Sequence, residues 1–120
     1  MTIGDGSFLY NPVVPALTTS DEYELPILII VCNNKKYAVM EQLHNRFYPK
    51  GTAITTKDYY GVHINNSGYE HAAEIVGGYG QLVEKPADLK PAIKAALACV
   101  AAGKPAILNV MMPDAGVQRS

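Results

Sequence analysis

Three short apolar runs along the chain are typical of β-strands that are buried on both faces. The first is Leu25–Cys32, the second is Ala106–Met111, and a weaker one is Gln81–Glu84. The first two runs lack the alternation of polar and apolar positions that marks a half-exposed strand. We therefore expect them to form central strands of a parallel sheet, with helices on both faces.

The clearest helical pattern lies between the runs Gln81–Glu84 and Ala106–Met111. Apolar residues recur every three or four positions from Leu89 to Val100, and Gly103 follows as a helix-ending residue. Pro91 is placed near the start of this helix, where a missing N–H costs little. One face of this helix is expected to cover the sheet.

Three further segments are expected to be helical: a helix that begins at Asn11-Pro12, Tyr37–Phe47, and Tyr69–Val76. Pro15 would cost the first of them a hydrogen bond, and the last is expected to face inward with Ala72, Ile75 and Val76. The stretch from Tyr48 to Gly68 has no clear period and is interpreted as a long, functional loop. Strands that alternate with helices predict an α/β fold with a parallel sheet.

Composition narrows the class of protein. With 120 residues, the chain is expected to form a single domain, residues 1–120. A net charge of −1 gives no electrostatic argument for a nucleic-acid or membrane partner. Neither a signal peptide nor an apolar stretch long enough to span a bilayer is visible, and two cysteines make no disulfide framework. These features favour a cytoplasmic protein.

Polar residues follow two of the expected strands. Gly4-Asp5-Gly6-Ser7 comes after a short strand stub, and Asn33-Asn34-Lys35-Lys36-Tyr37 comes directly after Leu25–Cys32. Ligands of open parallel sheets bind beyond the carboxyl ends of the strands. If the two strands are neighbours, Asp5 and an asparagine amide share one crevice, where carboxylate, amide and carbonyl oxygens suit Mg²⁺ or Ca²⁺. Free N–H groups at Gly6 and Ser7 would suit a phosphate, so the pattern indicates a site for a metal and a diphosphate.

The spacing of these two motifs resembles a known fingerprint. Gly4-Asp5-Gly6, then 26 residues (Ser7 to Cys32), then Asn33-Asn34, is similar to the motif of thiamine-diphosphate-dependent enzymes. Two sequence segments, GDGSFLYNPVVPAL and LPILIIVCNNKKYAVM, resemble the diphosphate-binding domain of the 2-oxoacid decarboxylase and acetolactate synthase family. The likeness continues through LVEKPADLKPAIKAAL and AILNV, and it implies a partial, flavodoxin-like thiamine-diphosphate-binding fold. The interval of 26 is long for the family, and the additional residues are expected in a turn at Thr18–Glu24.

The resemblance implies a role for each matching position. Asp5 and Asn34 would be side-chain ligands of Mg²⁺, and the main-chain carbonyl of Lys36 would be the third protein ligand. Thiamine diphosphate would be held by the residues around the two motifs: Gly4, Asp5, Gly6, Ser7, Asn34, Lys36 and Tyr37. Two interpretations of Tyr37 stay open, a cofactor contact and a core aromatic, whereas Asn33 is expected to be a turn residue.

The resemblance also implies an activity, the decarboxylation or carboligation of a small 2-oxo acid by a lyase or transferase. In the family, the activating glutamate belongs to a separate pyrimidine-binding domain, which these 120 residues do not include. We therefore expect the C-terminal part of a diphosphate-binding domain, truncated at its N-terminus, with no catalytic residue and no activity alone. Its expected partners are a pyrimidine-binding domain or subunit and, in a homo-oligomer, further copies. Two alternatives remain: a separate cofactor-binding subunit of a two-chain enzyme, and an inactive fragment that keeps only the fold.

The remaining chemistry-bearing residues are expected to have structural roles. Cys32 and Cys99 are interpreted as inert core thiols. His44 follows the second motif by a helix length and is the one histidine that could face a substrate. Gly77-Gly78-Tyr79-Gly80 lacks the context of a dinucleotide-binding motif and is interpreted as a helix-ending turn.

Overall fold

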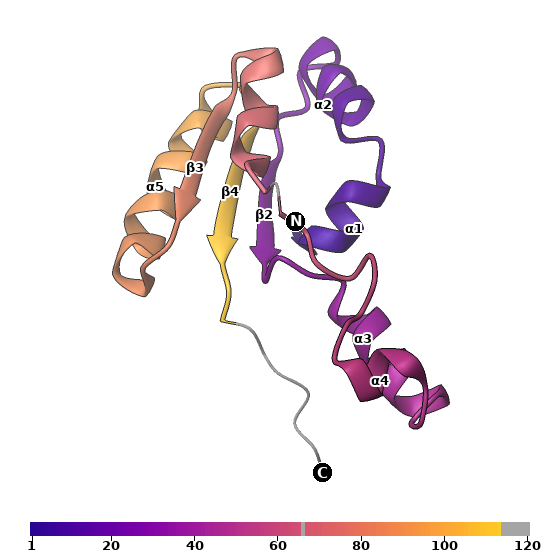
Figure 1. Ribbon diagram of the computed structural model, residues 1–120. Coiled ribbons are helices and arrows are strands. Elements are labelled where there is room, and N and C mark those ends of the chain that lie inside the picture. Colours follow the sequence, from indigo (N-terminus) through magenta and orange to yellow (C-terminus); the bar gives the residue numbers. More distant parts are fainter. Residues whose placement is uncertain (66, 114–120) are drawn as a thin grey trace.

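The protein folds around a parallel sheet of four strands (Figure 1). The computed structural model describes residues 1–65 and 67–113. The strands are β1 (Thr2–Gly4), β2 (Leu28–Asn33), β3 (Tyr79–Val83) and β4 (Ala106–Met111). Their order in the sheet is β1-β2-β4-β3, and every pair is parallel. The predicted α/β class is confirmed.

The two strands that precede the polar motifs are neighbours. β1 pairs with β2 in a register that sets Gly4 opposite Cys32. Asp5 and Asn33 therefore continue from adjacent positions at the same edge of the sheet. The two strands are therefore neighbours, which is the condition for Asp5 and an asparagine amide to share one crevice.

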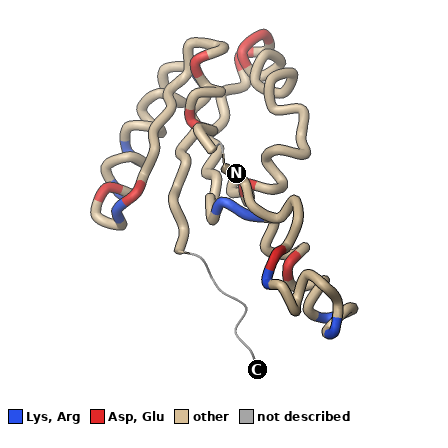
Figure 2. The backbone as a smooth tube through the Cα atoms, viewed as in Figure 1, with Lys and Arg blue, Asp and Glu red and all other residues tan. Residues whose placement is uncertain are grey.

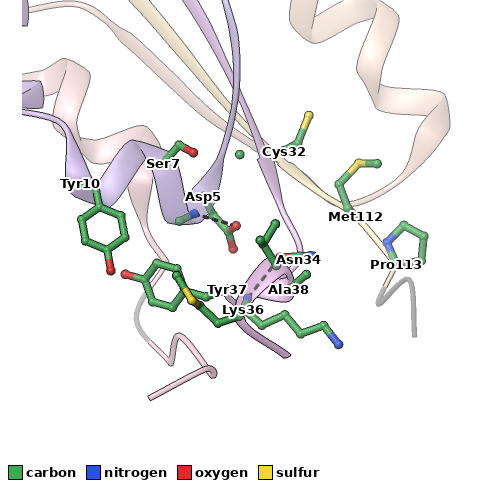
Figure 3. Close-up of a pocket in the computed structure, with 14 residues that line it drawn as sticks. Asp5, Ser7, Tyr10, Cys32, Asn34, Lys36, Tyr37, Ala38, Met112 and Pro113 are labelled. Atoms are coloured by element: carbon green, nitrogen blue, oxygen red, sulfur yellow. Dashed lines mark hydrogen bonds between the residues drawn. The ribbon is translucent and has the colours of Figure 1, made fainter. Parts of the chain in front are cut away.

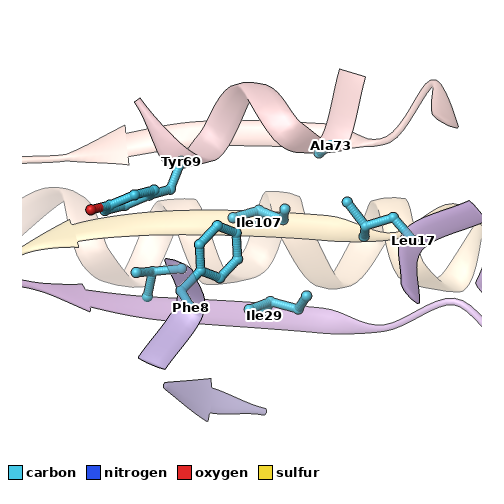
Figure 4. Packing of buried hydrophobic residues seen from close by; sticks show 7 residues of the cluster. Phe8, Leu17, Ile29, Tyr69, Ala73 and Ile107 are labelled. Carbon is cyan, nitrogen blue, oxygen red and sulfur yellow. The ribbon is translucent and has the colours of Figure 1, made fainter. Parts of the chain in front are cut away.

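Helices cover both faces of the sheet, as the buried strands require. On one face, α1 (Asp5–Tyr10), α2 (Val13–Glu22) and the 3₁₀ helix η1 (Tyr69–Val76) pack on the sheet. Phe8, Leu17 and Tyr69 meet Ile107 in this core cluster (Figure 4). On the other face, α5 (Pro86–Ala101) covers the sheet with Ala92 and Ala96 against Leu108.

A helical arm extends away from the sheet after β2. It contains α3 (Ala38–Phe47) and α4 (Thr52–Thr56), and neither helix buries a residue. Figure 1 shows this arm below the carboxyl end of β2. The expected helix Tyr37–Phe47 is confirmed with Tyr37 as its N-cap, whereas α4 lies in a stretch that was expected to be loop alone.

The start of β2 differs from the expectation, because Leu25, which was expected to begin the strand, is hydrogen-bonded to Ser20 of α2. The Leu25 N–H donates to the Ser20 carbonyl at 2.8 Å, and the Ser20 hydroxyl donates to the Leu25 carbonyl at 2.6 Å. These bonds hold Leu25 outside the sheet, so the strand begins at Leu28. The expected turn at Thr18–Glu24 is likewise wrong in part, since α2 continues to Glu22.

The first helices also correct the expected start at Asn11-Pro12. α1 precedes that position, and the Asn11 side chain donates back to the Ser7 carbonyl at 2.7 Å. Pro12 is then the N-cap of α2. Pro15 is the third residue of α2, where no intrahelical N–H bond exists to be lost, so the expected cost does not arise.

Three other positions differ in detail. α5 begins at Pro86, so Pro91 lies inside the helix rather than near its start. Ala72 and Val76 pack on the core as expected, together with Tyr69 and Ala73, whereas Ile75 was expected to face inward but is 54% exposed. The third strand spans Tyr79–Val83 where Gln81–Glu84 was expected.

Within residues 1–65 and 67–113, no helix has the length and apolar character needed to cross a membrane.

Candidate cofactor-binding site

All seven residues predicted to bind the cofactor line one cavity of about 560 Å³. The cavity lies where β1 and β2 end, between α1 and the start of α3 (Figure 3). Its wall contains Gly4, Asp5, Gly6, Ser7, Tyr10, Cys32, Asn34, Lys36, Tyr37, Ala38, Val39, Met40, Met112 and Pro113. The tertiary structure thus brings together two motifs that the sequence separates by 26 residues.

Asp5 is the buried acidic group of this cavity. It is the first residue of α1, directly after β1, and it is only 4% exposed. Its Oδ1 accepts a hydrogen bond from the Gly6 N–H at 2.9 Å, whereas its buried Oδ2 has no hydrogen-bond partner in the described structure. A buried carboxylate oxygen without a donor is costly unless a cation satisfies it, so Oδ2 fits a metal ligand.

The Gly6 N–H departs from the expectation of a free donor. It was expected to be available to a phosphate, but it is engaged by the Asp5 carboxylate. A diphosphate in this cavity would therefore either approach the Gly6 backbone closely without accepting its N–H, or displace the hydrogen bond between the Gly6 N–H and Asp5 Oδ1.

The second motif forms a tight turn held by its own side chains. Asn33 Oδ1 accepts from the Lys35 N–H at 2.9 Å, and Asn34 Oδ1 accepts from the Lys36 N–H at 3.2 Å. Lys35 has a φ of 57°, a left-handed conformation that costs energy for a residue other than glycine. The paired asparagine bonds stabilise this turn. Asn33 was expected to be a turn residue, but it is the last residue of β2, and it caps the turn through its side chain. Asn34 lies beside Asp5 in the cavity (Figure 3).

Lys36 carries a charge into the same region, and that charge is paired. Its ammonium contacts Glu41 Oε2 at 2.9 Å, and the Lys36 side chain is only 5% exposed. Because Glu41 on α3 neutralises the ammonium, a lysine at this position need not repel a bound cation. This pairing is consistent with a ligand role for the Lys36 main chain.

Tyr37 packs its ring directly on Gly6. A Cβ at position 6 would lie 2.6 Å from Tyr37 Cδ1, so a side chain at Gly6 has no room. The Tyr10 ring is close by, with its centroid 5.6 Å from that of Tyr37. Tyr37 is half-buried and lines the cavity, and its two interpretations, a cofactor contact and a core aromatic of the following helix, both stay predictions.

Tyr69 is a neighbour of the site that the sequence analysis did not single out. Its ring packs on Phe8 with a centroid distance of 5.2 Å, and its buried hydroxyl has no hydrogen-bond partner within the described residues. Burial, followed by the negative charge of Asp5, raises the pKa of Tyr69 to about 12. The phenol therefore stays neutral near Asp5. No local pattern marks it, because 69 is remote from both motifs in sequence.

Two other expectations have different outcomes. His44 does not line the cavity among the described residues; its Nδ1 is 2.8 Å from the Met40 carbonyl and its ring contacts Tyr59. Cys32, expected to be a core thiol, is half-buried and lies on the cavity wall. Cys32 lies on this wall because it is next to the last residue of β2, and the cavity begins where that strand ends.

Charged residues elsewhere are interspersed along the described chain (Figure 2). Near the cavity, Lys35 and Lys36 form the blue segment that follows β2. Asp5 and Asn34 place a carboxylate and an amide oxygen on the cavity wall next to this basic pair. Such a donor set fits Mg²⁺, which keeps few protein ligands and takes others from a phosphate.

Comparisons with known proteins agree with this site. Residues 1–110 match the family described as thiamine pyrophosphate enzyme, C-terminal TPP binding domain. The thiamine diphosphate-dependent 4-hydroxybenzoylformate decarboxylase of Rhodococcus jostii RHA1 is 28% identical, with a TM-score of 0.73 over 93% of this chain. The benzoylformate decarboxylase of Polynucleobacter necessarius is 20% identical, with a TM-score of 0.70 over 93% of this chain, and shows the fold alone.

This chain spans 19% of the length of each of those two proteins. The family match covers most of the chain, and it includes both strand ends that line the cavity. The protein therefore belongs to the C-terminal, thiamine-pyrophosphate-binding domain family of the thiamine pyrophosphate enzymes.

Proposed function

We propose that this domain anchors the diphosphate of thiamine diphosphate through Mg²⁺, in an enzyme that decarboxylates or carboligates 2-oxo acids. The observation that carries the proposal is the buried Asp5 Oδ2, which has no hydrogen-bond partner among residues 1–65 and 67–113 and belongs to a cavity shared by every predicted ligand. When bound, thiamine diphosphate supplies the carbanion that attacks the carbonyl carbon of a 2-oxo acid.

Each part of this chain has a defined task in the proposed site. Asp5 and Asn34 bind the cation through side-chain oxygens, and the Lys36 carbonyl provides the third protein ligand. Ser7 lines the cavity and binds phosphate oxygens through its hydroxyl in this proposal. Tyr37 and Tyr10 form an aromatic wall on one side of the cavity.

We further propose that the open side of the cavity is completed by a pyrimidine-binding domain or subunit, in a homo-oligomer. Support comes from α3, whose Val39 and Phe47 are each 62% exposed and which buries no residue. Exposed apolar side chains of this kind commonly mark an interface. The activating glutamate would come from that partner, so the chain alone is expected not to turn over substrate.

The substrate is proposed to be a 2-oxo acid. Because the more similar of the two matched proteins is a 4-hydroxybenzoylformate decarboxylase, aryl 2-oxo acids are the first class to test with a reconstituted enzyme. Ala38, Val39 and Met40 form the apolar part of the cavity that such a group would reach. An acetolactate synthase-like activity would instead require a second 2-oxo acid.

The anchor can be tested by calorimetric titration of thiamine diphosphate into the chain, with Mg²⁺ and then with EDTA. We expect metal-dependent binding that Asp5→Asn weakens by roughly tenfold or more, because the variant keeps the side-chain size and loses the ligand charge. Asp88→Asn is the matched control, since Asp88 also lies in the first turn of a helix but on the far face of the sheet.

Inorganic pyrophosphate separates the anchor from the rest of the cofactor site. If this chain holds only the anchor, Mg²⁺-pyrophosphate and Mg²⁺-thiamine diphosphate will bind with affinities within about tenfold of each other. No Mg²⁺-dependent binding of either compound by the folded chain would contradict the proposal.

A further inference from the structure

We propose that Glu70 acts as a positioning residue for the turn that carries Asn34 and Lys36, through a buried relay made with Asn109 and Asn33. Where it concerns metal binding, this inference rests on the proposed function. Glu70 lies on η1, Asn109 on β4 and Asn33 at the end of β2. The relay thus runs from η1 across the covered face of the sheet, from β4 to β2, and ends at the turn of the candidate metal site.

Each link of the relay is a short hydrogen bond. Asn109 Nδ2 donates to Glu70 Oε2 and to the Ser67 carbonyl, both at 2.6 Å. Asn33 Nδ2 donates to Asn109 Oδ1 at 2.9 Å. Asn33 Oδ1 in turn accepts from the Lys35 N–H at 2.9 Å.

Because the relay is buried, breaking any of its hydrogen bonds is costly. Asn33 and Asn109 are both fully buried, at 0% exposure, and the Glu70 side chain is only 12% exposed. An amide left unpaired in such an environment destabilises the folded chain, because it loses its hydrogen bonds to water and gains none in return. Both asparagines are therefore held in one arrangement, with water largely excluded.

The direction of the relay is set by two acceptors, Glu70 Oε2 and the Ser67 carbonyl. Both only accept hydrogen bonds here, so the Asn109 amide must turn its NH₂ group toward them. Its oxygen then faces Asn33, which must present its own NH₂ group and leave Oδ1 for Lys35. Glu70 thereby helps to hold the orientation of the amide that caps the left-handed Lys35.

The placement of Glu70 depends on a glycine in the neighbouring strand. A Cβ at Gly80 would lie 2.1 Å from the Glu70 carbonyl oxygen, so η1 approaches β3 too closely for any side chain there. Gly80 is part of the motif Gly77-Gly78-Tyr79-Gly80. The expectation of a helix-ending turn is confirmed at Gly77, which ends η1 with a φ of 64°, and Gly80 adds a second role by letting Glu70 reach Asn109.

The test compares Glu70→Ala with Glu70→Gln in the full chain. Hydrogen exchange of the Lys35 amide, followed by NMR without metal or cofactor, reports the last bond of the relay. We expect Glu70→Ala to accelerate this exchange by roughly tenfold and to weaken Mg²⁺ affinity in the presence of pyrophosphate by a similar factor. Glu70→Gln keeps an acceptor oxygen and should retain most of both properties.

Glu74→Ala is the matched control, because Glu74 lies on the same helix but contacts His71 instead of Asn109. Thermal unfolding of each variant checks that the fold is retained. A folded Glu70→Ala variant with unchanged Lys35 exchange, or with unchanged Mg²⁺ affinity, overturns the inference. If the wild-type chain binds no metal, the proposed function fails, and the exchange of Lys35 in the unliganded protein still decides whether the relay holds the turn.

Discussion

At the scale of single residues, the site depends on positions where the choice of side chain is narrow. Asp5 keeps a carboxylate oxygen buried without a donor, which lowers stability unless a cation is bound. Gly6 is required for a different reason, since the Tyr37 ring occupies the space of its side chain. Both residues belong to the motif that the sequence analysis identified, but only the second requirement explains why glycine follows the aspartate.

Gly6→Ala should displace the Tyr37 ring, because the new Cβ would lie 2.6 Å from Tyr37 Cδ1. We expect a loss of about 1–3 kcal/mol in the free energy of unfolding, measured by urea denaturation. The same change in a Tyr37→Ala background should cost clearly less, since the clash is gone. Gly4→Ala is the control for stability, because no atom lies within 4 Å of its added Cβ. Equal losses at Gly4 and Gly6 would argue against the clash.

At the scale of elements, η1 links the sheet, α1 and the candidate site. Tyr69 packs on Phe8 of α1, and Glu70 reaches Asn109 of β4 from the next position. A helix was expected over Tyr69–Val76, and its bounds are confirmed. Of its three residues expected to face inward, Ala72 and Val76 pack on the core, and the expectation for Ile75 was wrong because Tyr69 and Ala73 take the buried positions beside them.

Tyr69 should make the docking of η1 sensitive to alkaline pH. Its pKa is about 12 in the folded chain against 10.0 ordinarily, so folding favours the neutral phenol. The corresponding stability is fully present below about pH 10 and is lost as the pH rises from there toward 12. We expect the wild type to lose on the order of 2 kcal/mol more than Tyr69→Phe across this range, measured by urea denaturation.

Tyr60→Phe is the matched control for this pH dependence, because Tyr60 is 95% exposed. Near neutral pH, Tyr69→Phe should be at least as stable as the wild type, because the variant removes a buried hydroxyl without a partner. An alkaline loss that is the same in Tyr69→Phe and the wild type would contradict the assignment.

At the scale of the whole molecule, β4 joins the two cores. Ile107 belongs to the cluster under α1, α2 and η1, and Leu108 belongs to the cluster under α5. Successive strand residues point to opposite faces, so one central strand holds both layers together. This arrangement also places Asn109 where it can join η1 to the end of β2.

Ile107→Ala should therefore destabilise the whole chain. Ile107 is fully buried in the central strand, and the cavity left by its side chain is expected to cost about 2–5 kcal/mol. Leu82→Ala on the edge strand β3 is the control, since Leu82 is 41% exposed and should cost much less. Chemical denaturation of both variants measures the difference. Similar losses for the two would show that β4 is not the centre of the core.

Much of the fold follows from local patterns in the sequence. The run Ala106–Met111 is a strand with the bounds that its apolar pattern predicts, and the apolar spacing from Leu89 to Val100 lies within α5. Boundaries failed where a hydrogen bond between elements decided them, as at Leu25, which Ser20 holds at the end of α2. A pattern of apolar residues contains no information about such a bond.

By itself, the sequence determined the class of fold and the two motifs of the candidate site, because burial periodicity and motif spacing are properties of the chain order. Only the tertiary structure decided that the motifs meet, through the register of β1 on β2. It also decided the roles of Tyr69, Glu70 and Asn109, which lie far from Asp5 and Asn34 in sequence. Their contacts arise from packing η1 on a central strand, and packing between remote segments leaves no local pattern for a sequence to display.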